Sequence, residues 1–237
     1  MFRILIVEDD QGTFTAQMNA ISRAFTEADG ELGVSIHIAR SVSKGKQTIE
    51  EAHRNKRPYH AVILDAKLPP EDGYPTQVDE SLCLLIRDLM KSTLVAHVSM
   101  YGDDEKVKDH LRRIHQEQIN PKSFALSKSA TDAIELIKRL RSFLYSMRVE
   151  EQMNSLFGQQ VDLSFADKGR GRATAQRSRI ERDSTLDLAT LRRDIVAHWA
   201  DLDERLKERI RLVFRVDPNS TPVRISLVRS PDSPQGA

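Results

Sequence analysis

Apolar and polar positions follow two different rhythms along the first 145 residues of the chain. Short apolar runs, which predict strands, are separated by stretches in which apolar residues recur every three or four positions, as on one face of a helix. The predicted strands cover 3–7, 34–38, 61–64, 94–98 and 124–126. The predicted helices lie around 18–25, 43–55, 82–89 and 107–114, with a fifth starting at 131. This alternation is typical of an α/β domain with a five-stranded, doubly wound parallel sheet.

The fifth predicted helix continues past the point where such a domain could end. No Gly or Pro interrupts it before Gly158, and its apolar face is extended by Ile134, Ile137, Leu140, Leu144 and Met147. We therefore predict a domain at 1–145 and a helix extension or linker at 146–158. An exposed apolar seam of this kind usually packs against another part of the chain or against a second copy.

The region 159–229 has a different organisation and is predicted to be a small α+β unit. A short strand is expected at 161–165. The following segment, 168–182, carries six basic residues and one acid with almost no apolar side chains, so we interpret it as a basic loop.

One long helix is predicted from about 184 to 215. Ser184 and Asp187 have the spacing of a capping box at its start. Its apolar face comprises Leu188, Leu191, Ile195, Trp199, Leu202, Leu206 and Ile210. A pair of strands is expected next, around 212–216 and 223–227, and the Pro/Ser-rich tail 230–237 is expected to be flexible.

Composition and charge narrow the class of protein. The 237 residues include 36 Lys and Arg against 35 Asp and Glu, so the bulk charge selects no partner. No apolar run approaches the roughly 18 to 20 residues of a membrane span, and the run FRILIV is too short for a signal peptide, which predicts a cytoplasmic protein without a membrane partner. Cys83 is the only cysteine, so we expect no intrachain disulfide and no Cys-based metal cage, only a buried, inert thiol.

Polar residues gather at the predicted carboxyl ends of the strands, where a doubly wound sheet binds its ligands. They are Glu8, Asp9 and Asp10 after the first strand, Asp65 after the third, Ser99 at the end of the fourth, and Lys128 after the fifth. Clustered carboxylates repel one another and need a cation, and an all-oxygen ligand set suits Mg²⁺. With Mg²⁺ bound, the Asp65 carboxylate can attack a phosphoryl group, whose oxygens Lys128 and the Ser99 hydroxyl can hold.

These motifs resemble the CheY-like receiver domain of bacterial two-component response regulators. The resemblance covers about residues 1–145 and rests on ILIVEDD, VILDAKLPPEDG, HVS and FALSK, in this order along the chain. It implies that Asp65 is the phosphoacceptor and that Ser99 and Lys128 contact the phosphoryl group.

The resemblance also implies a ligand set for Mg²⁺. Asp9 would bind the metal directly, Glu8 partly through water, and Lys67 through its main-chain carbonyl, together with Asp65. The sequence departs from the family pattern at Met100, where small residues are usual, at Ser129, where Pro is usual, and at Ala125, where a switch aromatic often lies. These departures concern the switch more than the phosphoacceptor chemistry.

The predicted function is therefore that of a response regulator. A sensor histidine kinase or phosphotransfer protein would phosphorylate Asp65 in a Mg²⁺-dependent reaction, and the C-terminal region would switch protein–protein interaction or homodimerisation. We do not predict an enzyme, because no catalytic output motif follows residue 150.

Two alternatives stay open. One is a nucleic-acid-binding transcriptional regulator that uses the basic C-terminal region, and the other is a receiver-like scaffold that is not phosphorylated. A helix-turn-helix is not expected in the C-terminal region, because 184–215 is predicted to be one helix and not two or three short ones.

Overall fold

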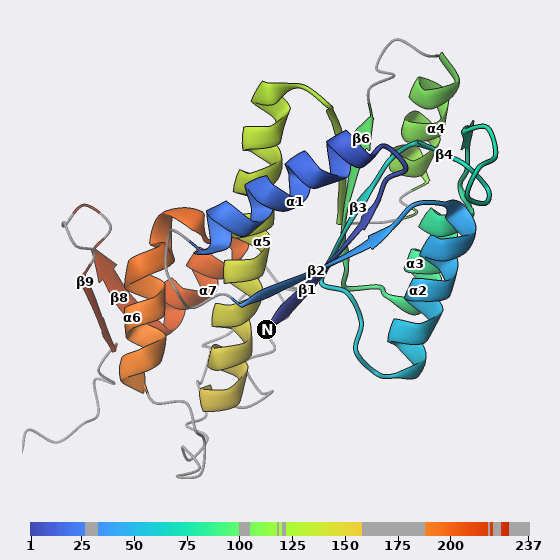
Figure 1. Cartoon of the computed structure of the whole chain (residues 1–237). Helices are drawn as coiled ribbons and strands as arrows, with labels where there is room; N and C mark the ends of the chain where they lie inside the picture. Colours follow the sequence, from blue (N-terminus) through green and yellow to red (C-terminus); the bar gives the residue numbers. More distant parts are fainter. Residues whose placement is uncertain are drawn as a thin grey trace, which may run out of the picture. The chain divides into compact units, whose positions relative to one another are not determined.

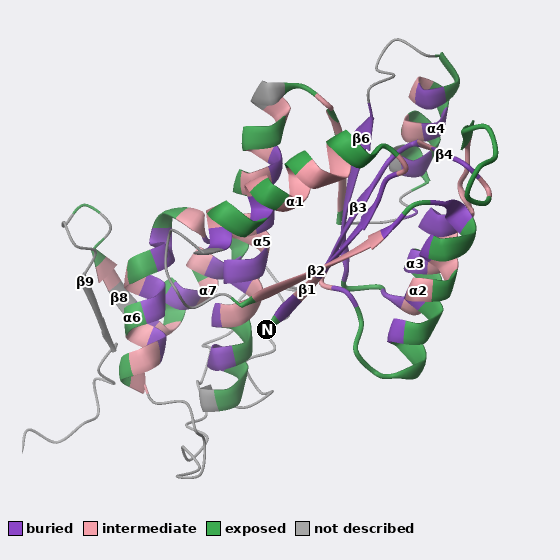
Figure 2. Ribbon diagram, in the orientation of Figure 1, coloured by how far each residue is buried: buried purple, intermediate pink, exposed green. Residues whose placement is uncertain are grey.

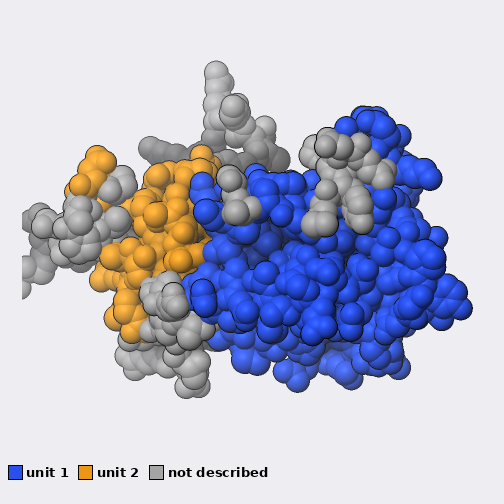
Figure 3. Space-filling model, turned by 45° about the horizontal axis from the view of Figure 1, so that its top comes forward, with its two compact units in different colours: residues 1–140 blue, residues 141–237 orange. Residues whose placement is uncertain are grey.

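The computed structural model describes residues 1–26, 33–99, 105–117, 119, 122–157, 188–217, 219 and 224–227. The chain divides into two compact units, unit 1 at residues 1–140 and unit 2 at residues 141–237 (Figure 3). The boundary between them falls inside helix α5 (Ala130–Phe157). No helix among the described residues is both long enough and apolar enough to cross a membrane.

Unit 1 contains a parallel five-stranded sheet in the order β2-β1-β3-β6-β7. Its strands are β1 (Phe2–Val7), β2 (Val34–Ala39), β3 (Ala61–Leu64), β6 (Leu94–Ser99) and β7 (Ser123–Ser127). This confirms the predicted doubly wound α/β fold. The strand order reverses between β1 and β3, which is the position where such sheets open a crevice for ligands.

Helices cover both faces of this sheet (Figure 1). Helix α1 (Gln11–Thr26) and the first part of α5 lie on one face, and α2 (Val42–Arg54), α3 (Ser81–Leu89) and α4 (Glu105–Gln116) lie on the other. The central strands β1, β3 and β6 are therefore buried on both sides, whereas β2 and β7 at the edges are only partly buried (Figure 2). This accounts for the continuous apolar runs in the central strands, since a strand that is covered on both faces has no polar side.

Helices α2 and α3 approach each other closely over the sheet. A Cβ atom added at Gly45 would lie 3.1 Å from Cδ2 of Leu82 and 3.4 Å from Cγ1 of Val7. The apolar core on this side also includes Ile49, Val62, Leu64, Ile86 and Val95. Glycine at position 45 thus permits a helix spacing that a larger side chain would obstruct.

A small antiparallel hairpin follows β3 and was not predicted. It pairs β4 (Lys67–Leu68) with β5 (Gln77–Val78). Its turn contains Gly73, whose φ of 89° is readily adopted only by glycine. The hairpin accounts for the length of the segment after Asp65, since it forms two short strands of its own beside the main sheet.

Unit 2 contains the end of α5, α6 (Leu188–His198), a 3₁₀ turn (Trp199–Asp201), α7 (Glu204–Val213) and a hairpin of β8 (Phe214–Asp217) and β9 (Arg224–Leu227). The predicted C-terminal hairpin is confirmed, with Val216 opposite Ile225, although Leu212 belongs to α7 and not to the strand. The predicted extension of the fifth helix is also present, since α5 continues to Phe157.

Contacts of buried polar groups connect α5 to α6. The carboxylate of Asp194 on α6 accepts a hydrogen bond from Nε2 of Gln152 at 2.6 Å, and Arg148 lies 3.1 Å from the same oxygen. The ring of Tyr145 stacks on that of His198, with centroids 3.7 Å apart. Asp194 and Tyr145 are at most 2% exposed, so these contacts form the interior of unit 2.

The prediction of one helix from 184 to about 215 is wrong. Leu202 adopts an extended conformation (ψ 145°), and Asp203 caps a new helix by accepting the N–H of Leu206 at 2.7 Å. The N–H of Asp203 donates to the Ser146 hydroxyl on α5 at 2.9 Å. These two bonds satisfy backbone groups at the break, so the chain turns there although the apolar pattern continues.

The remaining C-terminal predictions lie outside the described residues. They are the strand at 161–165, the basic loop at 168–182, the capping box of Ser184 and Asp187, and the tail at 230–237.

Candidate functional site

The predicted acidic residues meet at the carboxyl edge of the sheet in unit 1. Val7 pairs with Leu64, so the residues after these two strands, Glu8 and Asp65, are neighbours, and the N–H of Asp65 donates to the carbonyl of Val7 at 3.0 Å. Glu8 is 2% exposed and Asp65 6% exposed. Carboxylate oxygens of Glu8, Asp9 and Asp65 lie within 4.8 Å of one another, as ligands of one cation would.

Lys128 supplies the positive charge of this cluster. Its Nζ lies 2.5 Å from Oε2 of Glu8 and 2.7 Å from Oδ2 of Asp65. The main-chain N–H of Lys128 donates to the carbonyl of Ser99 at 3.1 Å, which joins the ends of β6 and β7. Sequence reasoning placed Lys128 at the end of the fifth strand, and the structure brings its ammonium group to the two carboxylates.

Ser99 is the last residue of β6 and is 4% exposed. It lies two positions after His97, which pairs with Leu64 on β3, so Ser99 belongs to the same edge of the sheet as Asp65. Met100, the departure from the family pattern that follows it, lies outside the described residues. Ala125 is exposed on β7 and pairs with His97.

The protonation of the site depends on its burial. Burial raises the pKa of Glu8 from 4.5 to about 7; the hydrogen bond from Lys128 opposes this rise, and the negative charge of Asp65 adds to it. Burial disfavours the ammonium form of Lys128, but its hydrogen bonds to Asp65 and Glu8 outweigh that effect, so the pKa of Lys128 is raised. A second cation would relieve the crowding of negative charge that remains around Glu8.

Two further residues hold the cluster in place. Asp10 caps α1 by accepting the N–H of Thr13 at 2.7 Å, and hydrogen bonds from the side chain and the main chain of Thr13 lower the pKa of Asp10. The N–H of Asp10 donates to Oε1 of Glu8 at 3.1 Å, and the N–H of Lys67 donates to Oδ1 of Asp65 at 3.2 Å. Asp10 is one of the acids predicted at the end of the first strand, and in the structure its carboxylate caps the start of α1.

The residues present fit a magnesium ion. Three carboxylates provide hard oxygen ligands, and the loops after β1 and β3 hold them within a few ångströms of a single point. The Asp65 carboxylate lies within 4.8 Å of carboxylate oxygens of Glu8 and Asp9 and pairs with the Lys128 ammonium, so a metal held by these carboxylates would add a second positive charge beside the acceptor. This arrangement suits phosphoryl transfer, in which positioning and charge neutralisation provide most of the catalysis.

Neither a protein-family model nor a curated protein sequence matches the chain. Solved structures of response regulators are similar to it in fold. The phosphorylated cyanobacterial phytochrome response regulator RcpA is 18% identical, and the match covers 62% of this chain and 95% of that one with a TM-score of 0.44.

Two further solved structures give similar values. The beryllofluoride-activated receiver domain of DrrB is 22% identical, with 61% and 97% of the two chains covered and a TM-score of 0.39. The Mn²⁺-bound response regulator Rcp1 is 17% identical, with 61% and 94% covered and a TM-score of 0.40.

Sequence reasoning did not anticipate a second cluster in unit 1, formed by Cys83, His97 and His110. These residues come from α3, β6 and α4, so their spacing along the chain carries no metal-binding signature.

Proposed function

We propose that unit 1 is a receiver domain in which Asp65 accepts a phosphoryl group in a Mg²⁺-dependent reaction. The observation that carries this proposal is the convergence of the Asp65 carboxylate with Glu8, Asp9 and the Lys128 ammonium at one edge of the sheet. A sensor histidine kinase or a phosphotransfer protein would supply the phosphoryl group. The domain assists this transfer but has no catalytic output of its own.

The side chains divide the chemistry among them. Glu8, Asp9 and Asp65 would hold Mg²⁺, which would supply positive charge to neutralise the acceptor and the phosphoryl oxygens. An oxygen of Asp65 bonds to phosphorus while the bond from phosphorus to the donor nitrogen breaks, and the electron pair of that bond stays with the donor imidazole. The Lys128 ammonium pairs with a phosphoryl oxygen, and the Ser99 hydroxyl donates a hydrogen bond to another.

Phosphorylation would act on the rest of the chain through Lys128. The phosphoryl group adds nearly two negative charges, which compete with Glu8 for the ammonium group. Lys128 is joined to Ser99 through its main chain and precedes the start of α5 by two residues. A shift at this point acts on the first turn of a helix that continues into unit 2, and we propose that unit 2 changes its protein–protein contacts or homodimerises in response.

Intact-mass analysis tests the phosphoacceptor. Incubation with acetyl phosphate and Mg²⁺ should add one phosphoryl group to wild type and none to Asp65→Asn. Asp72→Asn, which alters an exposed acid in the β4–β5 turn, is the matched control and should react like wild type. Equal labelling of Asp65→Asn, or no labelling of a folded wild type, would contradict the proposal.

Light scattering tests the output. Wild type is measured with and without Mg²⁺ and beryllofluoride, an analogue of the aspartyl phosphate, beside Asp65→Asn. A change in mass that requires both additions and an intact Asp65 supports phosphorylation-dependent oligomerisation. The same mass under all conditions contradicts homodimerisation as the output while leaving the phosphoacceptor test unaffected.

The break between α6 and α7 favours a second candidate function, nucleic-acid binding by unit 2. Two short helices, a turn and a β-hairpin are elements of winged-helix modules, so the reason for not expecting a helix-turn-helix in the C-terminal region no longer holds. Arg205 and Arg211 on α7 are exposed. Fluorescence anisotropy with duplex DNA should show binding that weakens steeply with salt and is reduced by Arg205→Ala and Arg211→Ala. Binding that both variants retain in full would exclude α7 as the contact surface.

A further inference from the structure

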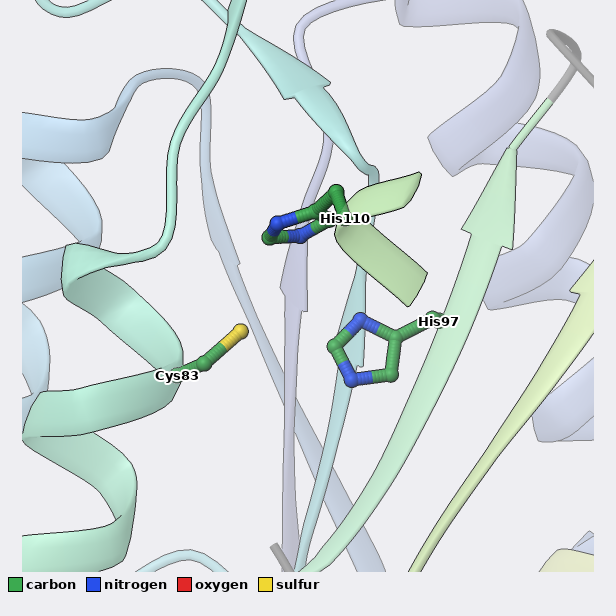
Figure 4. Close-up of side chains that lie close together, drawn as sticks. All are labelled: Cys83, His97 and His110. Carbon is green, nitrogen blue, oxygen red and sulfur yellow. The ribbon is translucent and has the colours of Figure 1, made fainter. Parts of the chain in front are cut away.

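Cys83, His97 and His110 form a buried cluster in unit 1, on the sheet face covered by α3 and α4 (Figure 4). Cys83 lies on α3, His97 on β6 and His110 on α4, and the three side chains point toward one another. One ligand atom from each lies within 4.8 Å of the other two. The exposed fractions are 0% for Cys83, 2% for His97 and 4% for His110, so the cluster is closed to solvent.

The two histidines have buried ring nitrogens that lack hydrogen-bond partners, and this lack costs free energy. Among the described residues, no hydrogen-bond partner is present for either ring nitrogen of His97 or for Nε2 of His110. A buried polar group that lacks a partner costs about 1 to 3 kcal/mol. Unsatisfied groups in a native interior call for an explanation, and an ion at the site is one of the few that apply.

A carboxylate orients His110 toward the cluster. Nδ1 of His110 lies 3.3 Å from Oε1 of Glu80, which also pairs with Arg113. A hydrogen bond at Nδ1 leaves Nε2, the unpartnered nitrogen, available as a ligand. A carboxylate that holds the outer nitrogen of a ligating histidine is the usual outer-shell partner of protein-bound zinc.

We propose that Cys83, His97 and His110 bind one zinc ion, or another divalent cation of similar softness, that joins α3 and α4 to β6. One sulfur and two imidazole nitrogens are ligands that zinc prefers, whereas Mg²⁺ prefers oxygen. Three protein ligands leave a fourth coordination position for a water molecule. The site is distinct from the carboxylate cluster of Glu8, Asp9 and Asp65, which has hard ligands, and the proposal does not depend on the phosphorylation of Asp65.

The protonation states of the ligands agree with this assignment. Burial lowers the pKa of His97 to about 3, so its imidazole is neutral at physiological pH and has a lone pair for a metal. Burial raises the pKa of Cys83 to about 12, so the thiol keeps its proton until a cation replaces it. Binding therefore forms a zinc–sulfur bond, breaks the S–H bond and releases one proton to solvent.

The positions of the ligand atoms suit a site that tightens on binding. With zinc–sulfur and zinc–nitrogen bonds of ordinary length, neighbouring tetrahedral ligand atoms lie about 3.4 to 3.6 Å apart. The rings of His97 and His110 are nearly perpendicular, with centroids 6.3 Å apart. The three ligand atoms lie within 4.8 Å of one another, so side-chain movements would have to bring them to this spacing when a metal binds.

Cobalt replaces zinc in the experiment, since Co²⁺ bound to sulfur has a charge-transfer band and tetrahedral Co²⁺ absorbs strongly in the visible region. Untagged full-length protein is titrated with Co²⁺ in saturating Mg²⁺, both in the native state and after refolding with Co²⁺. We expect one Co²⁺ per chain with a sulfur-to-cobalt band, which reports Cys83 alone because the chain has no other cysteine. Zn²⁺ should displace the Co²⁺ and abolish the spectrum.

Variants assign the signal to the cluster. Cys83→Ser should lose the charge-transfer band, His110→Gln should lose the tetrahedral spectrum, and Glu80→Gln should weaken Co²⁺ binding by at least about tenfold through the orientation of His110. His53→Gln, at an exposed position on α2, and Asp9→Asn, in the carboxylate cluster, should bind Co²⁺ like wild type. Circular dichroism verifies that each variant is folded.

The proposal would be overturned by no Co²⁺ or Zn²⁺ binding by wild type in either preparation, by binding without a sulfur band, or by equal binding by a folded Cys83→Ser variant. Binding that Asp9→Asn abolishes would assign the ion to the carboxylate cluster and would likewise reject the site at Cys83.

Discussion

The candidate phosphoacceptor site depends on one ammonium group that is shared between two buried carboxylates. Lys128 contacts both Glu8 and Asp65, and its own side chain is 9% exposed. Removing one member of such a group leaves the others charged in a medium of low polarity, which is far more costly than the loss of an exposed ion pair. A cation bound at these carboxylates would therefore stabilise the folded state.

Lys128→Met should lower the free energy of unfolding by about 3 to 5 kcal/mol, because Glu8 and Asp65 lose their countercharge. Mg²⁺ should restore part of this loss. Urea unfolding with and without Mg²⁺ measures both effects. Lys91→Met, at an exposed position, is the control and should change stability by less than about 0.5 kcal/mol. A Lys128 variant as stable as the control would show that the carboxylates do not require the ammonium group.

His60 is expected to make unit 1 less stable in mild acid. Nδ1 of His60 accepts the main-chain N–H of Arg3 at 3.0 Å, and burial lowers the pKa of His60 below 6.5. The unfolded chain therefore takes up the proton first, so the contribution of His60 is complete above pH 6.5 and is lost as the pH falls through the lower folded-state pKa.

His60→Asn keeps an acceptor near the same place but does not titrate. The dependence of urea unfolding on pH between 6.5 and 5 should be shallower for this variant than for wild type. His53→Asn, at an exposed histidine, should leave the dependence unchanged. Identical slopes for wild type and His60→Asn would mean that this group does not contribute.

At the scale of elements, the capping residue Asp203 sets the start of α7. The apolar residues of α6 and α7 continue in phase closely enough to predict one helix, but Asp203 provides a local alternative in which its side chain and its N–H are both hydrogen-bonded. The spacing of apolar residues indicates which face of a helix is buried, but it does not reveal a short break in the helix. The same limit applies to the β4–β5 hairpin, whose strands have two residues each.

Asp203→Ala should lower the free energy of unfolding by about 1 kcal/mol, because the N–H of Leu206 loses its cap. Asp203→Ser, which can accept the same hydrogen bond, should retain most of the wild-type stability. Thermal and urea unfolding of the three proteins measure the difference. If the serine variant is as unstable as the alanine variant, the capping bond is not the source of the effect.

At the scale of the whole molecule, α5 is the element that both units share. Its first residues follow Lys128, and its last turns carry Tyr145, Arg148 and Gln152 into the interior of unit 2. Helix α5 is therefore continuous across the boundary between the two units. Ligands that bind only the folded state also act on the molecule as a whole, since they shift its unfolding equilibrium by mass action.

Mg²⁺ at ten times its dissociation constant should raise the free energy of unfolding of wild type by about 1.4 kcal/mol. Asp9→Asn should lose most of this increase, because the carboxylate cluster has one ligand fewer. The measurement is urea unfolding at constant ionic strength, with NaCl in place of MgCl₂ as the reference. Equal stabilisation of the variant and wild type would show that Mg²⁺ acts elsewhere.

Local periodicity determined the sheet of unit 1, because strands and helices have different repeats and the central strands are apolar throughout. The same pattern located Glu8, Asp9, Asp65, Ser99 and Lys128, since the carboxyl ends of parallel strands share one edge. Only the tertiary structure decided which groups touch. It paired Lys128 with Glu8, used Asp10 as a helix cap, and divided the last long helix at Asp203. It also brought together Cys83, His97 and His110 from three elements, a proximity that no spacing along the chain encodes.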